Sequence, residues 1–462
     1  MRRPGSHATL TALFAADDRA RRRTQPMVTQ APSGDGSLPL AALDLTPAAI
    51  RERFRWAQRN GHPQYLWPNV PVGAWRSGLD EIERVSRAVL GGAGGPTSLR
   101  LPSGSVEALG VAAFSSGMGP LLGYWLEAGL LGAPEAVRQL LLLHLAHGRL
   151  RARRLEDQAQ RVLQVLADVD IRGTVLKGVE TGRRFFPSPG TRPSSDVDLL
   201  VEPGRMDEAE VALREAGYDC LSPRNPRRDR SEWAPRGASR DLRSLDLTHG
   251  DNPITIDLHG SLDRNVLGIA TVGFGSLDHH RRVPWADVHP AGGVLAQPLL
   301  TAFLAVHAST GLLNLTMIRM TELVLVIRSG LETGDLVWAE LSDALAQSGG
   351  DRFVHPAFEM AERLVPGTVD PGFREEVARR ATSRVRTYVA ALTPATAQRL
   401  EVRSMRERLM WVSGPLDLAR TIRETVVPPG LGSVRSLGRL YSQRIWRVLR
   451  GRVSLGPDRT ES

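Results

Sequence analysis

The order of apolar and polar positions divides the chain into a mixed central part and two flanking helical parts. Short apolar runs ending at Leu176, Val201, Leu221 and Leu258 are typical of buried strands. Before residue 169 and after residue 290, apolar residues recur at helical spacing, which predicts amphipathic helices. The pattern therefore predicts an α+β protein in which a small mixed sheet lies between helical domains.

Four segments follow from this pattern. Residues 1–40 are rich in Arg, Ser, Gly, Thr and Pro without periodicity, so we expect a disordered tail. Residues 41–168 are expected to form an N-terminal helical domain, and residues 291–462 a C-terminal helical domain. Residues 169–290 carry the predicted strands and form the central domain.

Turn residues and prolines set the expected helix limits in the N-terminal domain. Thr46 and Pro47 read as an N-cap and first helical residue, leading into a helix over residues 48–59. Residues 60–104 hold many Pro and Gly, so we expect loop with short helices. Residues 106–130 are expected to form two helices, broken near residues 117–120.

A long helix should start at Pro134. Its apolar stripe consists of Val137, Leu140, Leu141, Leu145, Leu155, Ala159, Val162 and Leu166. Four arginines lie in its middle, at Arg149, Arg151, Arg153 and Arg154. We expect them to form a solvated face; the alternative is a basic wall of a substrate cleft.

The C-terminal domain is expected to be helical throughout. Helices are predicted over residues 298–312, 318–328, 336–348, 354–364 and 373–392. Beyond Pro428 a last helix has apolar residues on one side and arginines elsewhere. We expect this helix to pack on the helical domain, and contact with an anionic membrane surface is the alternative.

Candidate chemistry begins with Asp196 and Asp198, at the head of the apolar run that ends at Val201. Alternate side chains of a strand share a face, so both carboxylates point the same way. Like charges held so close repel each other unless a cation lies between them. The pair therefore predicts a site for a hard divalent ion such as Mg²⁺, which binds carboxylate oxygens and leaves room for substrate phosphates.

Lys177 and Gly178 follow the first predicted strand. A glycine lets the backbone approach a ligand closely, and the helix expected after it offers N–H groups to an anion. Lys177 is the single lysine of the chain, since the other 58 of its 59 Lys and Arg residues are Arg. This usage suggests that an ammonium group, which suits a phosphate, is favoured at this position; the alternative is that one lysine persists by drift.

A third acid follows from two further predicted strands, over residues 244–248 and 254–258. The turn residues between them predict a hairpin. Asp257 is an isolated acid on the second strand, and Asp246 on the first is its rival. His259 shares a face with Asp257 and either hydrogen-bonds the site or serves as a structural histidine.

Residues 223–243 carry seven arginines and three prolines but no apolar run. We expect a long loop between strands, near the active edge, that binds an anionic substrate or covers it; solubility is the alternative explanation of its charge. The net charge of +9 and pI of about 10.6 also favour anionic partners such as nucleotides, RNA or acidic lipids.

Cysteine usage and hydropathy bear on the compartment. The chain has one cysteine, Cys220, so it has no internal disulfide or zinc cluster, which fits a reducing cytoplasm. No signal peptide is recognisable, and the most apolar stretch, residues 109–126, is too polar to insert in a membrane. We therefore expect a cytoplasmic protein without an integral membrane segment.

An ordered set of motifs links the central domain to a known family. The set consists of Lys177-Gly178, Phe186-Pro187, Arg192-Pro193-Ser194-Ser195-Asp196-Val197-Asp198, Ala216-Gly217-Tyr218 and Asp257-Leu258-His259. It resembles the nucleotidyltransferase superfamily of DNA polymerase beta and the antibiotic nucleotidyltransferases. The closest resemblance is to a bacterial branch labelled uncharacterised nucleotidyltransferase family protein. Where the superfamily usually has Gly-Gly or Gly-Ser, this chain has Lys-Gly.

The resemblance implies a polymerase-beta-like core at residues 169–290 and an enzyme that moves an NMP from an NTP to a hydroxyl. Asp196, Asp198 and Asp257 would then be the catalytic residues and hold two Mg²⁺ ions. The donor NTP would be bound by Lys177, Gly178, Arg192 and Ser195. For Glu322, where the family more often has Asp, we expect a structural hydrogen bond.

The acceptor is left open as a small molecule, a peptide or RNA. Two alternatives also remain at this point. One is a toxin-like nucleotidyltransferase acting on tRNA or protein, and the other is a non-catalytic nucleotide-binding module.

Overall fold

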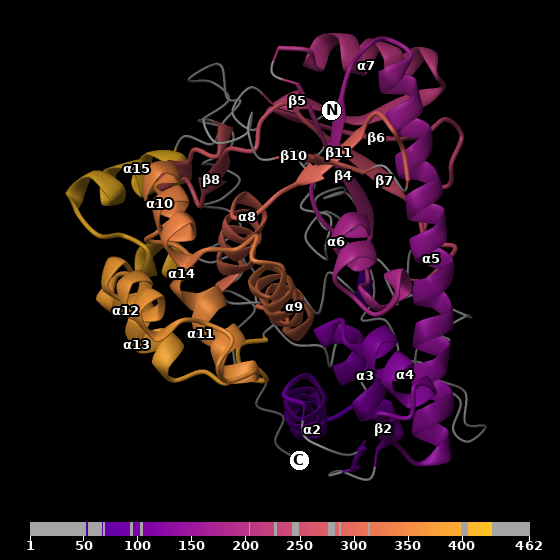
Figure 1. The fold of residues 1–462 in the computed structure, drawn as a ribbon, viewed down its shortest axis with the longest axis vertical. Helices are drawn as coiled ribbons and strands as arrows, with labels where there is room; N and C mark the ends of the chain where they lie inside the picture. The colour runs from indigo at the N-terminus through magenta and orange to yellow at the C-terminus, as the bar shows by residue number, and fades with distance from the viewer. Residues whose placement is uncertain are drawn as a thin grey trace, which may run out of the picture.

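The computed structural model describes most of the chain between residues 70 and 426 (Figure 1). The described residues are 52–53, 67, 70–92, 96–101, 105–202, 204–225, 229–242, 249–275, 282–285, 288–312, 315–398 and 405–426. The expected tail, most of the expected helix over residues 48–59 and the expected helix beyond Pro428 lie outside them.

A seven-stranded mixed sheet forms the centre of the fold, with strand order β10-β11-β3-β4-β7-β6-β5. Its strands are β3 (Gly173–Val175), β4 (Asp196–Val201), β5 (Tyr218–Asn225), β6 (Arg230–Pro235), β7 (Thr255–His259), β10 (Arg282–Pro284) and β11 (Gly292–Leu295). β4 pairs with β3 in antiparallel and with β7 in parallel orientation. Two short pairs lie apart from this sheet: β1 (Thr97–Ser98) with β2 (Leu131–Gly132), and β8 (Arg264–Val266) with β9 (Ala270–Val272).

One face of the sheet packs against α5 (Glu135–Ala167) and α7 (Met206–Glu215). Figure 1 shows α5 running along one side of the molecule and α7 across its end. β4 contributes Val197, Leu199 and Val201 to this core, and all three are fully buried. Since strand side chains alternate, Asp196 and Asp198 point to the opposite face.

That opposite face meets α8 (Leu299–Ser309) and α9 (Met317–Thr333). The short helix α6 (Val179–Arg184) contributes Val179 to the core on the α5 side and contacts α9 through Thr181. Leu176 and Leu200 belong to the same core as α8 and α9. This larger core also includes helices of both flanking regions: α2 (Val72–Leu90), α3 (Val106–Ser116), α4 (Gly119–Glu127), α10 (Trp338–Ser348), α11 (His355–Leu364), α12 (Pro371–Arg380), α13 (Ser383–Ala390) and α14 (Met405–Met410). The last described helix is α15 (Pro415–Val426).

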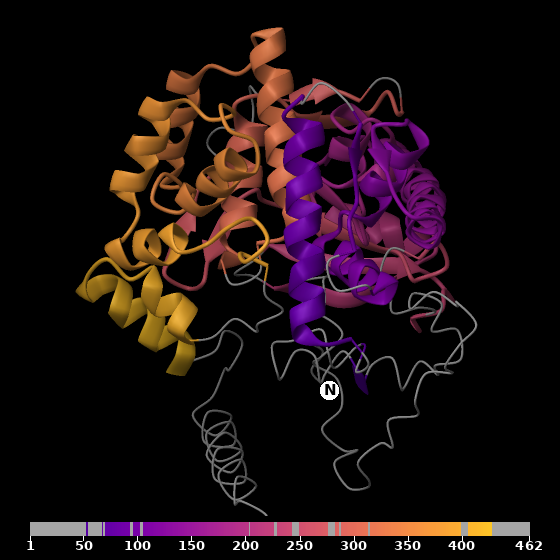
Figure 2. The same ribbon diagram turned by 90° about the horizontal axis from the view of Figure 1, so that it is seen from below.

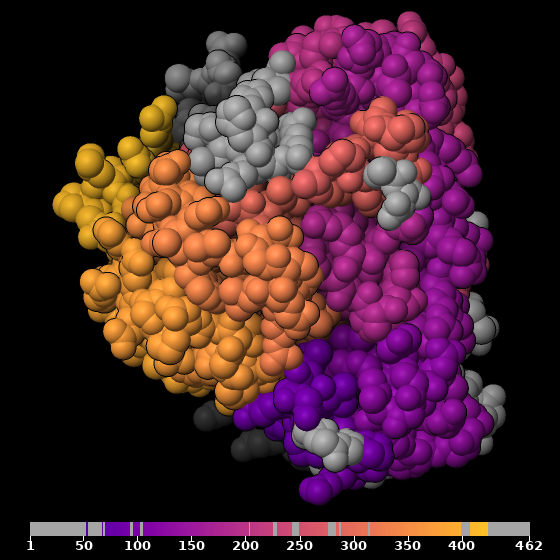
Figure 3. Space-filling view, viewed as in Figure 1, coloured from indigo at the N-terminus to yellow at the C-terminus, as the bar shows by residue number. Residues whose placement is uncertain are grey.

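Helix α2 joins the two helical regions. It lies between the N-terminal helices and the C-terminal ones in Figure 2, and Figure 3 shows the C-terminal lobe closed against the rest of the molecule. The carboxylate of Glu83 on α2 accepts a hydrogen bond from the backbone N–H of Ala395 at 2.7 Å. The guanidinium of Arg76 donates to the carbonyl of Gln398 at 3.1 Å. The helical regions at the two ends of the sequence therefore share one hydrophobic core.

The expectation of loop with short helices over residues 60–104 was wrong, because α2 occupies nineteen of these residues. Its buried face includes Trp75, Leu79, Ile82 and Val85 at helical spacing. Gly78 permits close packing on α3, since a Cβ there would lie 2.9 Å from Ala112 Cβ. The Pro and Gly content suggested a loop, but Gly78 lies within a helix and allows it to pack closely on α3.

The other helices follow the periodicity, with one correction. The break between α3 and α4 and the long helix after Pro134 were confirmed. The single helix expected over residues 373–392 is two helices, α12 and α13. Ala381 is extended between them, and Thr382 caps α13 by accepting a hydrogen bond from the N–H of Val385 at 3.2 Å.

The expectation of a loop throughout residues 223–243 was also wrong. β5 extends to Asn225, and Arg230–Pro235 forms β6, which pairs with both β5 and β7. Ser231 and Trp233 are buried on one face of β6, while Arg230 and Glu232 point to the other. Trp233 is the one large apolar residue of β6, so the sequence shows no clear alternation of apolar and polar positions from which to predict a strand. Residues 243–248, including Asp246, lie outside the described residues.

Within the described ranges, helix length and hydropathy bear on whether a helix could span a membrane. No single helix there has both the length and the apolar character needed to cross a bilayer, and the one pair that passes together, α3 and α4, is bent by 112°.

His355, the first residue of α11, predicts a pH-dependent stability. The pKa of its imidazole is lowered to about 4, mainly by burial; the charge of Glu359 opposes this shift, and the charges of nearby arginines contribute to it. The unfolded chain binds this proton below about pH 6.5, but the native state does not. The free energy of unfolding should therefore fall as pH drops from about 6.5 to 4, by up to roughly 3 kcal/mol.

Denaturant titrations at several pH values check this. His355→Gln should flatten the pH dependence by that amount. Parallel curves for wild type and His355→Gln would contradict the prediction.

Candidate active site

Three acids meet on the face of the sheet that turns away from α5. In the parallel pairing of β4 and β7, Asp198 lies directly opposite Asp257, and Asp196 lies opposite Thr255. In-register residues of neighbouring strands share a face, so all three carboxylates project to the same side. Asp196, Asp198 and Asp257 are 9%, 3% and 1% exposed, respectively. The structure therefore brings together the three acids that the sequence analysis selected.

His259 joins this group from the next same-face position of β7. Its Nε2 lies 3.2 Å from Oδ1 of Asp198, within hydrogen-bonding distance. Carboxylate oxygens of Asp198 and Asp257 and a ring nitrogen of His259 all lie within 4.8 Å of one another. Among the described residues, this is the one group of three or more His, Cys, Asp or Glu side chains close enough to hold a metal ion. Of the two roles considered for His259, the hydrogen bond to the site was confirmed.

Two basic side chains contact the carboxylates directly. The ammonium of Lys177 is paired with Oδ2 of Asp198, and the guanidinium of Arg230 is paired with Oδ2 of Asp257. Arg230 lies opposite His259 in the antiparallel pairing of β6 with β7. Sequence reasoning missed Arg230 because the segment was assigned to a loop.

The pKa values of Asp198 and Asp257 are shifted in opposite directions. Burial alone would raise the pKa of Asp198, but the ammonium of Lys177 and the hydrogen bond with His259 outweigh it, so the net pKa is well below the usual value. Burial raises the pKa of Asp257 well above its usual value, and the neighbouring acids add to this against the charge of Arg230. Burial also lowers the pKa of His259 to about 4, so its ring is neutral at pH 7.

This donor set fits a divalent metal. Hard ions such as Mg²⁺ prefer carboxylate oxygens, and three carboxylates project into one buried region. Burial is the main cause of the raised pKa of Asp257, and the charges of Asp196 and Asp198 add to it. A cation bound between these carboxylates would favour their ionised forms.

The turn after β3 places Lys177 and Gly178 beside the segment that leads into β4. Gly178 has φ 76° and ψ −95°, a conformation that favours glycine. A Cβ at this position would lie 2.6 Å from Oγ of Ser194 and 3.9 Å from Nη1 of Arg192. The backbone N–H of Gly178 donates to Oγ1 of Thr181 at 3.1 Å. Because Gly178 has no side chain, the turn after β3 can lie close to Ser194 in the segment before β4.

Ser195 and Arg192 lie in the same segment before β4. The hydroxyl of Ser195 lies 3.3 Å from Oδ1 of Asp196. Arg192 donates to both carboxylate oxygens of Glu322 on α9, at 3.0 and 2.9 Å, and to the carbonyl of Pro193 at 2.7 Å. The hydroxyl of Thr181 also donates to Glu322. The structural hydrogen bond expected for Glu322 was thus confirmed, and it ties α9 to both backbone segments beside the acids.

The four arginines in the middle of α5 have different environments. Arg149 pairs with Glu127, Arg154 pairs with Asp251, and Arg153 is exposed. Arg151 is only 2% exposed, so the expectation of a solvated face was wrong for this residue. Charge alone in the sequence could not show which arginine faces the sheet.

Comparison with known proteins adds a family to this geometry. Residues 105–366, more than half of the chain, match the model of a family described as an uncharacterised nucleotidyltransferase. The chain belongs to this nucleotidyltransferase family. Membership supports nucleotidyl transfer as the general activity and a nucleotide as substrate. No curated protein and no solved structure matched the chain.

Glu322 predicts a stability effect at this site. Glu322→Gln removes the charge that faces the buried guanidinium of Arg192, and an uncompensated buried charge costs about 3–5 kcal/mol. Thermal and denaturant unfolding should show a loss of that order. Glu332→Gln, at an exposed position of the same helix, should change stability by less than about 0.5 kcal/mol. Equal stability of the two variants would contradict the prediction.

Proposed function

We propose that this protein transfers an NMP from an NTP to a hydroxyl of an acceptor, with release of pyrophosphate, on a polymerase-beta-like core. The observation that carries the proposal is the register of Asp198 with Asp257 on adjacent parallel strands, with Asp196 on the same face. Three carboxylates from two separate stretches thereby converge at one buried location. The ion pairs of Lys177 with Asp198 and of Arg230 with Asp257 do not by themselves explain the third acid, Asp196.

Asp196, Asp198 and Asp257 would hold two Mg²⁺ ions. When bound, such ions supply Lewis-acid stabilisation of the triphosphate and lower the pKa of an acceptor hydroxyl. Asp257 is the proposed base, or the group that orients the base, for the attacking hydroxyl. His259 holds Asp198 in position through its hydrogen bond.

Residues of the first turn and of the segment before β4 would bind the donor. Lys177 would place its ammonium against the phosphates and help stabilise charge on the departing pyrophosphate. Nη1 of Arg192 lies 3.9 Å from where a Cβ of Gly178 would be, so its guanidinium would add positive charge beside the donor. Gly178 allows the donor to approach because it has no side chain. Ser195, which contacts Asp196, would hydrogen-bond the nucleotide from the same edge.

The carboxylates can be tested by label transfer. We expect transfer from labelled ATP, GTP, CTP or UTP to one member of an acceptor panel of small molecules, peptides and RNA. Asp196→Asn and Asp198→Asn should each reduce the rate by roughly 10³-fold, which corresponds to about 4 kcal/mol of barrier. Asp207→Asn, at an exposed acid of α7, should retain wild-type activity. Transfer that survives both substitutions would rule out the assignment of these acids.

The turn can be tested by nucleotide binding. Gly178→Ala would place a methyl group against the Ser194 hydroxyl and require a strained positive φ. Calorimetry with Mg²⁺ and a non-hydrolysable ATP analogue should show at least tenfold weaker binding. Gly204→Ala, where φ is also positive but a Cβ would meet no atom within 4 Å, controls for backbone strain. Equal loss of affinity in both variants would argue against a nucleotide site at Gly178.

A further inference from the structure

We propose that Arg151 is a positioning residue that holds the two backbone segments leading into the acid-bearing strands, an inference that rests on the proposed function. Arg151 comes from α5, on the side of the sheet opposite the acids. Its guanidinium is buried and reaches the segments before β4 and before β7. Five hydrogen bonds from this guanidinium go to backbone carbonyls, one of them that of Ser195.

The hydrogen bonds of Arg151 divide between the two segments. Before β4, Nε donates to the carbonyl of Ser194 at 2.9 Å and Nη2 donates to that of Ser195 at 2.6 Å. Before β7, Nη2 donates to Pro253 at 2.8 Å and Nη1 donates to Asn252 at 2.7 Å and to His249 at 3.4 Å. A guanidinium has five N–H donors, which equals the number of these carbonyl contacts.

These contacts begin where the strand pairing ends. The described register of β4 with β7 starts at Asp196 opposite Thr255. The carbonyl of Ser195 directly precedes Asp196, and that of Pro253 lies two residues before Thr255. Arg151 therefore supplies hydrogen bonds between the two segments just beyond the last ladder pair. Asp196, at the end of the ladder, depends most on this bridge.

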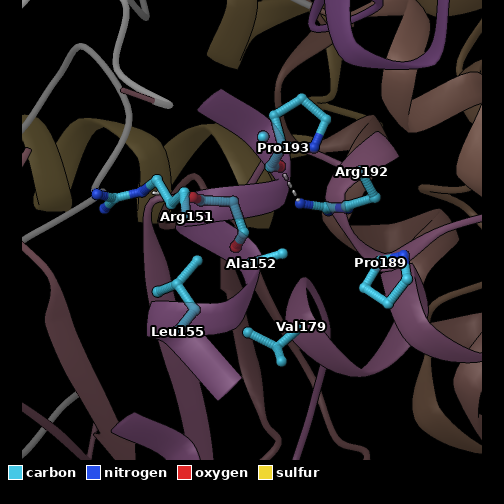
Figure 4. A pocket seen from close by; sticks show the side chains of 9 residues that line it. Arg151, Ala152, Leu155, Val179, Pro189, Arg192 and Pro193 are labelled. Carbon is cyan, nitrogen blue, oxygen red and sulfur yellow. Dashed lines mark hydrogen bonds between the residues drawn. The ribbon is translucent and has the colours of Figure 1, made fainter. Parts of the chain in front are cut away.

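The backbone of α5 near Arg151 is held in place by close packing. One turn away, Gly148 of α5 lies against the segment before β4, because a Cβ there would come within 2.2 Å of the carbonyl of Gly190. A small cavity of about 10 Å³, about the size of one water molecule, lies between α5 and this segment. Figure 4 shows Arg151 and Arg192 on either side of Pro193, so guanidinium groups from two elements hold this segment.

An arginine suits this task better than a lysine would. Its planar group presents donors in several fixed directions, while an ammonium has three donors on one atom. Carbonyls on two separate segments require the wider group. Arg151→Lys should therefore keep a positive charge but lose the bridge.

Two measurements on the full-length protein test the proposal. Hydrogen exchange of segments 194–196 and 249–255 should be at least tenfold faster in Arg151→Lys than in wild type. Mn²⁺ affinity, measured by electron paramagnetic resonance with a non-hydrolysable ATP analogue, should fall about tenfold. Arg153→Lys, at an exposed position two residues away, should match wild type in both measurements.

A double-mutant cycle separates positioning from general stability. In the Asp196→Asn background, Arg151→Lys should weaken Mn²⁺ binding by less than twofold, since the group that it positions is already gone. A further tenfold loss in that background would overturn the proposal, as would unchanged hydrogen exchange in the single variant. Wild-type protein that binds no Mn²⁺ would overturn the proposed function and this inference with it.

Chemical rescue provides a second variant. Arg151→Ala leaves space for a free guanidinium ion, so millimolar guanidinium should restore at least a third of the lost Mn²⁺ affinity, whereas equal sodium should not. If Arg151→Ala does not fold, the Arg151→Lys measurements decide alone. Rescue by sodium and guanidinium alike would overturn the proposal.

Discussion

The parallel pairing of β4 with β7 is the constraint on which the rest of the site depends. It sets Asp198 opposite Asp257 and leaves Asp196 at the end of the same face. Burying like charges so close together is unfavourable unless cations compensate them. Lys177 and Arg230 provide part of that compensation. Asp198, Asp257 and His259 on this face are also close enough together to hold a metal ion.

The two faces of the sheet perform different tasks. Toward α5 and α7, alternate residues of β4 and β7 form an apolar core that keeps the strands in register. Toward α8 and α9, the other residues carry the acids and their basic partners. The bidentate pair of Arg192 with Glu322 anchors the C-terminal helices to the segment before β4. The helical regions therefore help to support the geometry of the acids as well as surrounding them.

Arginine has at least three structural uses around this site. Arg230 compensates a buried acid, Arg192 connects a strand-leading segment to α9, and Arg151 contacts backbone carbonyls. Arg192 and Arg151 each use several donors of the planar guanidinium group at once. The one lysine of the chain lies instead against the central acid, Asp198, where a compact charge suffices. The basic composition is thus partly structural, and net charge alone does not identify the partner of this protein.

Local pattern was enough to predict the strand carrying Asp196 and Asp198, the strand carrying Asp257 and the long helix after Pro134, while the role of Asp257 came from the family resemblance. These features depend on alternation and spacing within short stretches, which any reader of the sequence can measure. Tertiary structure alone decided that Arg230 lies on a strand beside Asp257, that Arg151 is buried, and that the two helical regions share one core. The reason is that such contacts join residues far apart in sequence, where a single arginine looks the same whether it meets water, a carboxylate or five carbonyls.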